Sequence, residues 1–145
     1  MTLKNSRQIL LAFTALLWGL VATEFARADT LSINITNVHK AEGTVMLQIL
    51  TEQQFKEDAK PTAAFMQAAQ TGEMLYRATL APGAYALRIM HDVNDNGELD
   101  ANFVGIPTEP WAFSNNATGN FGPPTWEDVR FEVQGETEQV INLNK

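Results

Sequence analysis

The segment that begins at Asp92 combines oxygen-bearing side chains and a glycine at the spacing of a calcium-binding loop. It reads Asp92-Val93-Asn94-Asp95-Asn96-Gly97-Glu98-Leu99-Asp100, and its opening fits the pattern D-x-[DN]-x-[DN]-G. Oxygens at positions one, three and five converge when the backbone winds tightly, and glycine at position six permits the sharp turn. Leu99 is expected to point inward. The predicted calcium ligands are Asp92, Asn94, Asn96, Glu98 through its backbone carbonyl, and Asp100.

This segment departs from an EF-hand loop at position twelve, which is Phe103 instead of a bidentate glutamate. No helix signal flanks it, so it is more similar to the shorter calcium loops between strands of extracellular modules. A missing ligand would then come from Asn102, Glu109 or Asp128. A metal-free turn explains the same residues equally well, because Asn-Gly is also a hairpin signal. Both interpretations stay open.

His91 suggests a second function, since it adjoins the carboxylate of Asp92. A small hydrolase would use His91 with loop carboxylates as its acid and base, which requires a solvent-open imidazole. The alternative is a hydrogen-bonded histidine at a strand end. Ser32 and Ser114 lie in no nucleophile elbow, and two distant histidines without cysteine do not suit a closed zinc site. No catalytic residue is therefore assigned.

Aromatic side chains suggest a third function, in which Trp111 and Trp126 form a platform for a carbohydrate or a peptide. Both belong to a long segment, 92–128, that has no regular hydrophobic periodicity but also contains Phe103, Phe113 and Phe121. A disordered linker is poor in aromatic residues. We therefore expect this segment to be ordered and packed against the domain, and the tryptophans would serve equally well as its anchors.

Alternation of apolar and polar residues, which is typical of half-buried strands, dominates the rest of the chain. It predicts strands within 31–35, 45–49, 74–78, 85–91, 129–133 and 140–143. A capping box, Thr51 with Gln54, predicts a short helix over 51–59, and helical spacing in an alanine-rich stretch predicts another over 62–70. We expect a mainly all-β fold, an antiparallel β-sandwich of about seven strands, transthyretin-like or Ig-like, with one or two short helices and a long ordered loop. A small barrel is the alternative.

The N-terminus has the three parts of a secretory signal peptide. Lys4 and Arg7 precede an uncharged apolar run over 9–22, and Ala26-Arg27-Ala28 supplies small residues at the two positions that the peptidase reads. The apolar run is shorter than the roughly 20 residues of a membrane-spanning helix. We predict that residues 1–28 are removed, that a single domain spans 29–145, and that the protein is exported to the periplasm or beyond the cell.

Charge and cysteine content restrict the partners of this domain. Loss of residues 1–28 moves the formal net charge from −7 to −9. Nucleic acids and anionic membranes select basic surfaces, so neither is expected as a partner. The chain has no cysteine, so its stability comes from packing, hydrogen bonds or a bound ion. The expected partner is a protein, peptide or glycan at the cell envelope, with no membrane insertion after cleavage.

Three further stretches complete the sequence pattern. They are LAPGAYA at 80–86, GIPTEPWAFSNN at 105–116 and FGPPTWED at 121–128. Together with the segment 91–100, they are similar to the bacterial secreted domain-of-unknown-function family 2141 over essentially the whole mature chain. One departure is Trp111, where the family more often has tyrosine. The resemblance implies an exported β-sandwich and no established activity. We therefore expect a non-enzymatic binding or structural module with a calcium-type loop at 92–100.

Overall fold

The computed structural model describes residues 28–120 and 122–143. The predicted signal peptide lies outside these residues apart from Ala28. Within the described part, no helix is long and apolar enough to cross a membrane. Strand β1 begins at Asp29, so the predicted cleavage before this residue leaves every described strand intact.

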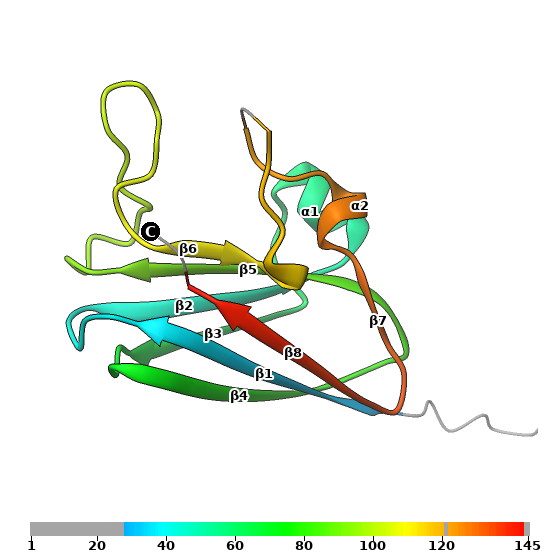
Figure 1. Ribbon diagram of the computed structural model, residues 1–145. Coiled ribbons are helices and arrows are strands. Elements are labelled where there is room, and N and C mark those ends of the chain that lie inside the picture. The colour runs from blue at the N-terminus through cyan, green and yellow to red at the C-terminus, as the bar shows by residue number, and fades with distance from the viewer. Residues whose placement is uncertain (1–27, 121, 144–145) are drawn as a thin grey trace, which may run out of the picture.

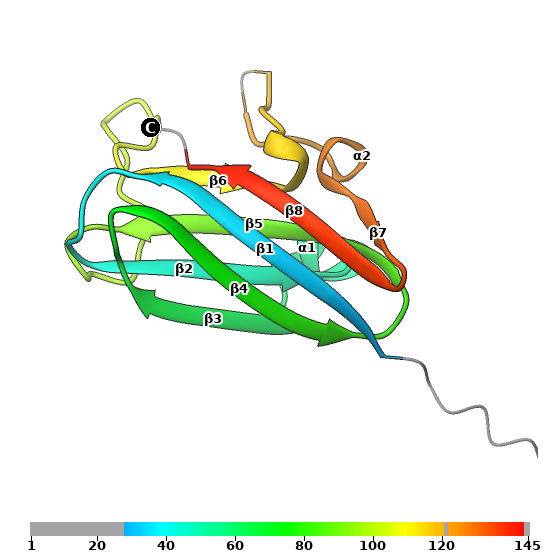
Figure 2. The same ribbon diagram turned by 60° about the horizontal axis from the view of Figure 1, so that its bottom comes forward.

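Two facing sheets form a sandwich, which confirms the expected fold class (Figures 1 and 2). One sheet has the order β4-β1-β8, with bounds Gly72–Leu80, Asp29–Val38 and Glu136–Asn142. The other has the order β3-β2-β5-β6, with bounds Ala63–Ala68, Thr44–Leu50, Gly83–Asp92 and Trp111–Phe113. Strand β7, Phe131–Val133, pairs with the start of β5. The described residues thus form eight strands, one more than the approximate prediction.

All these strand pairs are antiparallel except β1 with β8, which is parallel. Parallel neighbours need a connection that returns the chain to the same end of the sheet. Here the rest of the domain makes that return, because β1 and β8 lie near opposite ends of the chain. The first and last strands are therefore side by side in one sheet (Figure 2).

The core lies between the sheets and follows the predicted alternation. Leu31, Ile33 and Ile35 of β1 are fully buried, while Ser32 and Asn34 between them are only partly covered. The inward residues of β2, β4 and β5 also belong to this core. They are Val45, Leu47, Ile49, Met74, Tyr76, Ala78, Tyr85, Leu87 and Ile89.

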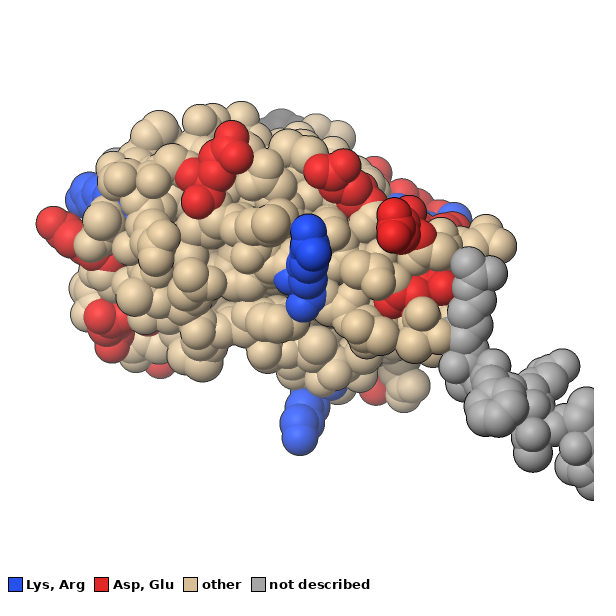
Figure 3. Space-filling view, turned by 90° about the horizontal axis from the view of Figure 1, so that it is seen from below, with Lys and Arg blue, Asp and Glu red and all other residues tan. Residues whose placement is uncertain are grey.

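The outer face of the β4-β1-β8 sheet is seen from below in Figure 3. Uncharged side chains cover most of it, and acidic and basic side chains lie among them. Leu75 and Val140 are exposed there, so this face is not uniformly polar.

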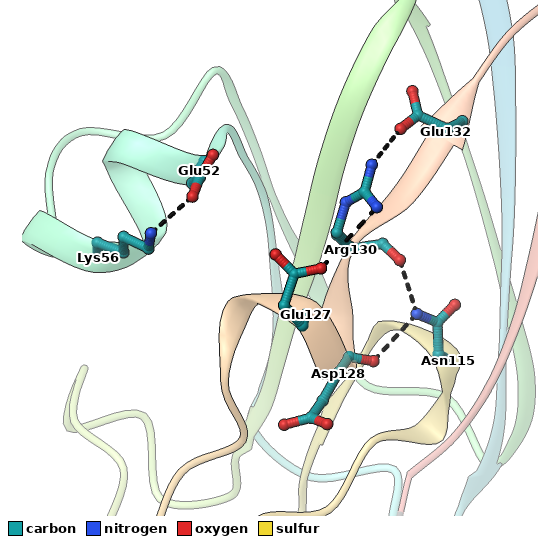
Figure 4. Close-up of polar contacts among 7 residues, drawn as sticks. All are labelled: Glu52, Lys56, Asn115, Glu127, Asp128, Arg130 and Glu132. Carbon is teal, nitrogen blue, oxygen red and sulfur yellow. Dashed lines mark hydrogen bonds and ion pairs between the residues drawn. The ribbon is translucent and has the colours of Figure 1, made fainter.

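Helix α1, Glu52–Glu57, confirms the prediction over 51–59. The backbone N–H of Thr51 donates to the Gln54 side chain at 2.9 Å, which completes the capping box. Lys56 pairs with Glu52 one turn earlier at 2.6 Å (Figure 4). The helix is followed by its C-cap residue Asp58, which adopts a left-handed conformation with φ 50°.

The predicted helix over 62–70 is wrong, because residues Ala63–Ala68 form the edge strand β3. This strand pairs along its whole length with β2, from Thr44 opposite Ala68 to Ile49 opposite Ala63. Hydrogen bonding to an existing strand thus outweighs the helical preference of alanine and methionine. Phe65 faces the core, where its ring lies 5.8 Å from that of Tyr76.

The segment 92–128 contains β6, a short 3-10 helix over Ser114–Asn116 and the start of helix α2, Trp126–Val129. Val129 thus belongs to this helix, and the strand predicted within 129–133 is shorter, at Phe131–Val133. Buried Ser114 joins them to the sheet, since its hydroxyl accepts from the Leu87 N–H and donates to the Val129 carbonyl. Asn115 donates to the carbonyls of Asp128 and Arg130 (Figure 4). The described part of the segment from β6 onwards is therefore ordered and tied to β5, as expected.

Stability at high pH is expected to depend on Tyr76, whose pKa burial raises to about 12. An unfolded tyrosine titrates near pH 10, so the unfolded chain loses this proton first. Stability from the neutral phenol is complete below about pH 10 and declines by about 2–3 kcal/mol as the pH rises through 12. Tyr76→Phe should remove this part of the alkaline decline in urea unfolding. An unchanged decline in the variant would contradict the assignment.

Candidate functional site

The acidic loop, residues 92–100, follows β5 directly and projects from one end of the sandwich (Figure 1). Asp92, the last residue of β5, is buried, and its two carboxylate oxygens accept from the N–H groups of Asn96 at 3.1 Å and Gly97 at 2.7 Å. Gly97 has φ 83°, a conformation that favours glycine. The carboxylate of Asp92 therefore holds the following turn of the loop closed through these two hydrogen bonds.

The other predicted ligands meet in the same loop. Asn94 and Asn96 donate from their side-chain amides to the two oxygens of Asp100, at 2.7 and 3.0 Å. Their own side-chain oxygens accept from the N–H groups of Asn96 and Glu98. The fold thus brings together four of the predicted ligands, Asp92, Asn94, Asn96 and Asp100. The fifth, Glu98, is exposed and contributes its backbone N–H to the same network.

Carboxylate and carboxamide oxygens are the ligand type that calcium takes, and each can still offer a second lone pair. Among the described residues, no group of three or more His, Cys, Asp or Glu side chains is arranged to hold a metal. The cluster instead consists of two carboxylates, Asp92 and Asp100, with the two asparagines. Of the three further ligands considered, Asn102 and Asp128 are engaged elsewhere, as hydrogen-bond partners in a hairpin tip and in the α2 capping box. Hydrogen bonds from Thr125 hold the pKa of Asp128 below its ordinary value.

Glu109 has a role that the sequence did not reveal. This residue is only 6 % exposed, and its carboxylate accepts from the N–H groups of Val93 at 2.7 Å and Asp100 at 3.0 Å. One buried side chain thereby clamps the first and last turns of the acidic loop. Nothing in the local pattern distinguishes Glu109 from a solvated acid, because its partners are backbone groups far along the chain.

His91 is 1 % exposed. Its Nε2 lies 2.7 Å from the backbone carbonyl of Glu42, and a carbonyl only accepts, so Nε2 carries the proton. Its backbone N–H donates to the carbonyl of Pro110. The hydrolase hypothesis required a solvent-open imidazole, and the burial of His91 argues against it. The histidine instead ties the start of β2 to the end of β5.

A groove of about 740 Å³ lies on the outer face of the β3-β2-β5-β6 sheet. The part of this face near the start of β5 is covered by a small cluster of Trp126, Val129, Phe55 and Phe113 over Ala86. The part beyond it stays open. Its floor consists of two cross-strand rows, Met46-Met90-Trp111 and Gln48-Arg88-Phe113.

Two loops form the walls of this groove, and they rise from the sheet as separate arms in Figure 1. One arm contributes Leu99 and residues 104–107, and the other contributes Gly122 and Pro123. Leu99 does not point into the core as predicted, since it lies in the groove wall and is partly exposed. The acidic loop therefore forms part of one groove wall through Leu99.

The structure separates the two predicted platform tryptophans. Trp111 is half-buried in the groove, and its ring meets that of Phe113 edge to face with centroids 5.6 Å apart. Trp126 is only 6 % exposed, and its ring lies 6.0 Å from that of Phe55. Trp126 thus anchors α2, and only Trp111 is displayed to a ligand.

Residues 33–141 match the DUF2141 family, described as uncharacterised proteins conserved in bacteria. The chain belongs to this family. The resemblance stated from the sequence is therefore confirmed, and the match contains the acidic loop, Glu109 and every groove residue. No curated protein and no solved structure matches the chain significantly. The function of this DUF2141 protein must be inferred from its own geometry.

Beside the groove, this DUF2141 protein holds an apolar hairpin tip, residues 101–107, closed by a bridge between Ala101 and Pro107. The side-chain oxygen of Asn102 accepts from the N–H groups of Val104 and Ile106. Phe103 at its end is 100 % exposed. The hydrogen bonds of Asn102 thus hold an apolar tip in one shape next to the groove entrance.

Proposed function

We propose that this protein is an exported, non-enzymatic binding module that holds its ligand in the groove above β2, β5 and β6. The groove carries this proposal, because binding sites are typically concave, mostly apolar and roughly 300–1,000 Å³ in volume. Methionines in its floor adapt to the shape of a ligand, and Trp111 adds a rigid aromatic surface.

Export is part of this proposal and is supported by the signal-like N-terminus and by the position of β1. Cleavage after Ala28 would start the mature chain at Asp29, the first residue of β1. Mass spectrometry of the protein from the periplasmic and culture fractions should find this N-terminus. Recovery of the intact chain from the cytosol alone would contradict it.

Ligand binding is tested with Nile red, a neutral dye whose fluorescence rises in apolar sites. We expect saturable binding to the wild-type protein and at least tenfold weaker binding to Met90→Glu, because a carboxylate placed in the groove floor must lose water. Met66→Glu is the matched control. Met66 lies in the same cross-strand row, opposite Met46, but outside the groove lining.

Circular dichroism confirms that both variants are folded before the comparison is made. Equal loss of dye binding in Met90→Glu and Met66→Glu, or absence of saturable binding to the wild-type protein, would overturn the groove as the binding site.

We also propose that calcium organises the acidic loop and thereby fixes the shared groove wall. This is supported by the convergence of Asp92, Asn94, Asn96 and Asp100, whose side chains already contact one another or the same turn. Asp92 and Asp100 would supply the charge that binds the ion. The asparagine amides would turn their oxygens towards it.

Calcium is expected to raise the melting temperature by mass action. At ten times the dissociation constant, the gain is about 1.4 kcal/mol, or on the order of 5 °C for a domain of this size. Melts in 2 mM calcium and in chelator are compared for the wild-type protein, Asp100→Asn and Asp95→Asn. Asp95 is the control, an exposed acid of the same loop. The calcium-dependent rise in melting temperature should be lost in Asp100→Asn and kept in Asp95→Asn. An equal melting temperature of the wild-type protein in calcium and in chelator would refute the proposal.

A further inference from the structure

Among the described residues that line the groove, one is charged, and it lies at one end of an apolar floor. Of the described residues that line it, Arg88 alone has an ionisable side chain. Arg88 and Gln48 face each other across β5 and β2, one row away from Met90 and Met46. The floor therefore presents a guanidinium and an amide at the end near α1, and it is apolar from the methionine row to the loop walls.

The contacts of Arg88 leave room for a second anion. Its Nη1 donates to Asp58 at 2.6 Å, and its guanidinium lies over the Phe55 ring, 5.8 Å from the centroid. Asp58 is at the surface, with a side chain 81 % exposed, and surface ion pairs of this kind are weak. A guanidinium has five N–H donors in a planar fork, so one contact with Asp58 uses only part of its capacity.

We propose that the ligand of this groove is an amphipathic small-molecule anion with a single charged head group and an apolar body. This inference rests on the proposed function and specifies its ligand class. The head group accepts from Arg88 and from the side-chain amide of Gln48, while the body lies on Met46, Met90 and Trp111. The apolar walls at Leu99 and Ile106 cover the far end of the body.

Charge complementarity favours an anion over a neutral or cationic ligand. The chain is acidic, with a formal net charge of −7. A groove that binds a cation would therefore be expected to contain some of these acidic side chains. The groove lining instead contains no carboxylate among its described residues. An apolar body supplies most of the binding energy through burial, and the guanidinium selects the head group.

Decanoate and 1-decanol test this inference, because they share one apolar chain and differ in charge. Each is titrated against Nile red bound to the wild-type protein, Arg88→Gln and Arg77→Gln. Arg77 is the matched control, an exposed arginine on β4 of the other sheet. We expect Arg88→Gln to weaken decanoate about tenfold more than it weakens decanol or Nile red. Arg77→Gln should change none of the three.

Two further variants test the geometry of the head-group site. Arg88→Lys keeps the positive charge but loses the planar set of N–H donors. The affinity of this variant for decanoate should therefore lie between those of the wild-type protein and Arg88→Gln. Asp58→Asn removes the competing carboxylate and keeps a residue that tolerates the left-handed conformation at this position. It should strengthen decanoate binding several-fold.

The possible failures are distinguishable. If neither decanoate nor decanol displaces the dye, and the dye itself does not bind in the groove, the proposed function fails. If both displace it and Arg88→Gln lowers neither affinity, the groove stands and the anionic ligand class is overturned. Equal weakening of decanoate and decanol in Arg88→Gln also overturns it, because the arginine would then act on the shape of the groove.

Discussion

Replacing Gly43 by alanine is expected to destabilise the protein by more than about 4 kcal/mol, a large part of the roughly 5–15 kcal/mol by which an ordinary domain is stable. A Cβ on Gly43 would lie 2.0 Å from the backbone oxygen of Asp92 and 2.7 Å from the Cα and carbonyl carbon of Val93. These are backbone atoms, so no side-chain rotation relieves the contact. Gly43 also has φ +70°, which costs alanine about another 1–2 kcal/mol.

Gly72→Ala separates the two causes. Gly72 has φ +99°, but nothing lies within 4 Å of the Cβ that would be added. This control should lose only the conformational part, about 1–2 kcal/mol. Urea unfolding measures both variants, and the soluble fraction on expression reports Gly43→Ala if it does not fold. A loss in Gly43→Ala no larger than that in Gly72→Ala would contradict the backbone clash.

The clash at Gly43 also affects the acidic loop of the candidate site. The carbonyl of Gly43 accepts from the Ala69 N–H at 3.0 Å, just after β3, while its Cα faces the start of the acidic loop. If Gly43→Ala folds at all, it must push Asp92 and Val93 away from the sheet. We therefore expect it to lose groove binding as well as stability.

Glu109→Ala is expected to have the second largest effect, a loss of about 2–5 kcal/mol. It removes both acceptors of a buried carboxylate and leaves the N–H groups of Val93 and Asp100 without partners, at about 1–3 kcal/mol for each buried group left unsatisfied. Glu109→Gln keeps one oxygen but turns an NH₂ group towards the other N–H. Its loss should therefore be smaller than that of Glu109→Ala.

Glu98→Ala is the control for Glu109→Ala, because Glu98 is an exposed acid of the same loop. It should stay within about 0.5 kcal/mol of wild type. Urea unfolding gives the stabilities, and limited proteolysis shows whether the acidic loop opens before the domain unfolds. Equal losses in Glu109→Ala and Glu98→Ala would show that Glu109 does not clamp the loop.

Local patterns predicted much of the fold in this protein. The alternation of Leu31, Ile33 and Ile35 places one face of β1 in the core whichever strands become its neighbours. The capping box of α1 depends on residues three positions apart, Thr51 and Gln54. His91 lies at the next alternate position of β5 after Tyr85, Leu87 and Ile89, and it is buried as they are. Each of these features depends on side chains within a few residues of one another.

Features that depend on distant partners were not predictable in the same way. Strand β3 has helical spacing, and only pairing with β2 makes it a strand. Strand β6 contains three residues, too few to show a period. Leu99 lies in the groove because another loop faces it there, and Trp126 is buried because Phe55 of α1 covers it.

The sequence by itself determined which residues form the acidic loop, because Asp92, Gly97 and Asp100 act through a turn that is local to the chain. The tertiary structure decided what surrounds the loop. Glu109 holds the loop through two hydrogen bonds. His91 is buried and bonds to the carbonyl of Glu42, and Leu99 lies in the groove wall. The physical reason is range: a turn closes through neighbouring residues, while a groove forms only where segments far apart in the chain leave one part of a sheet uncovered.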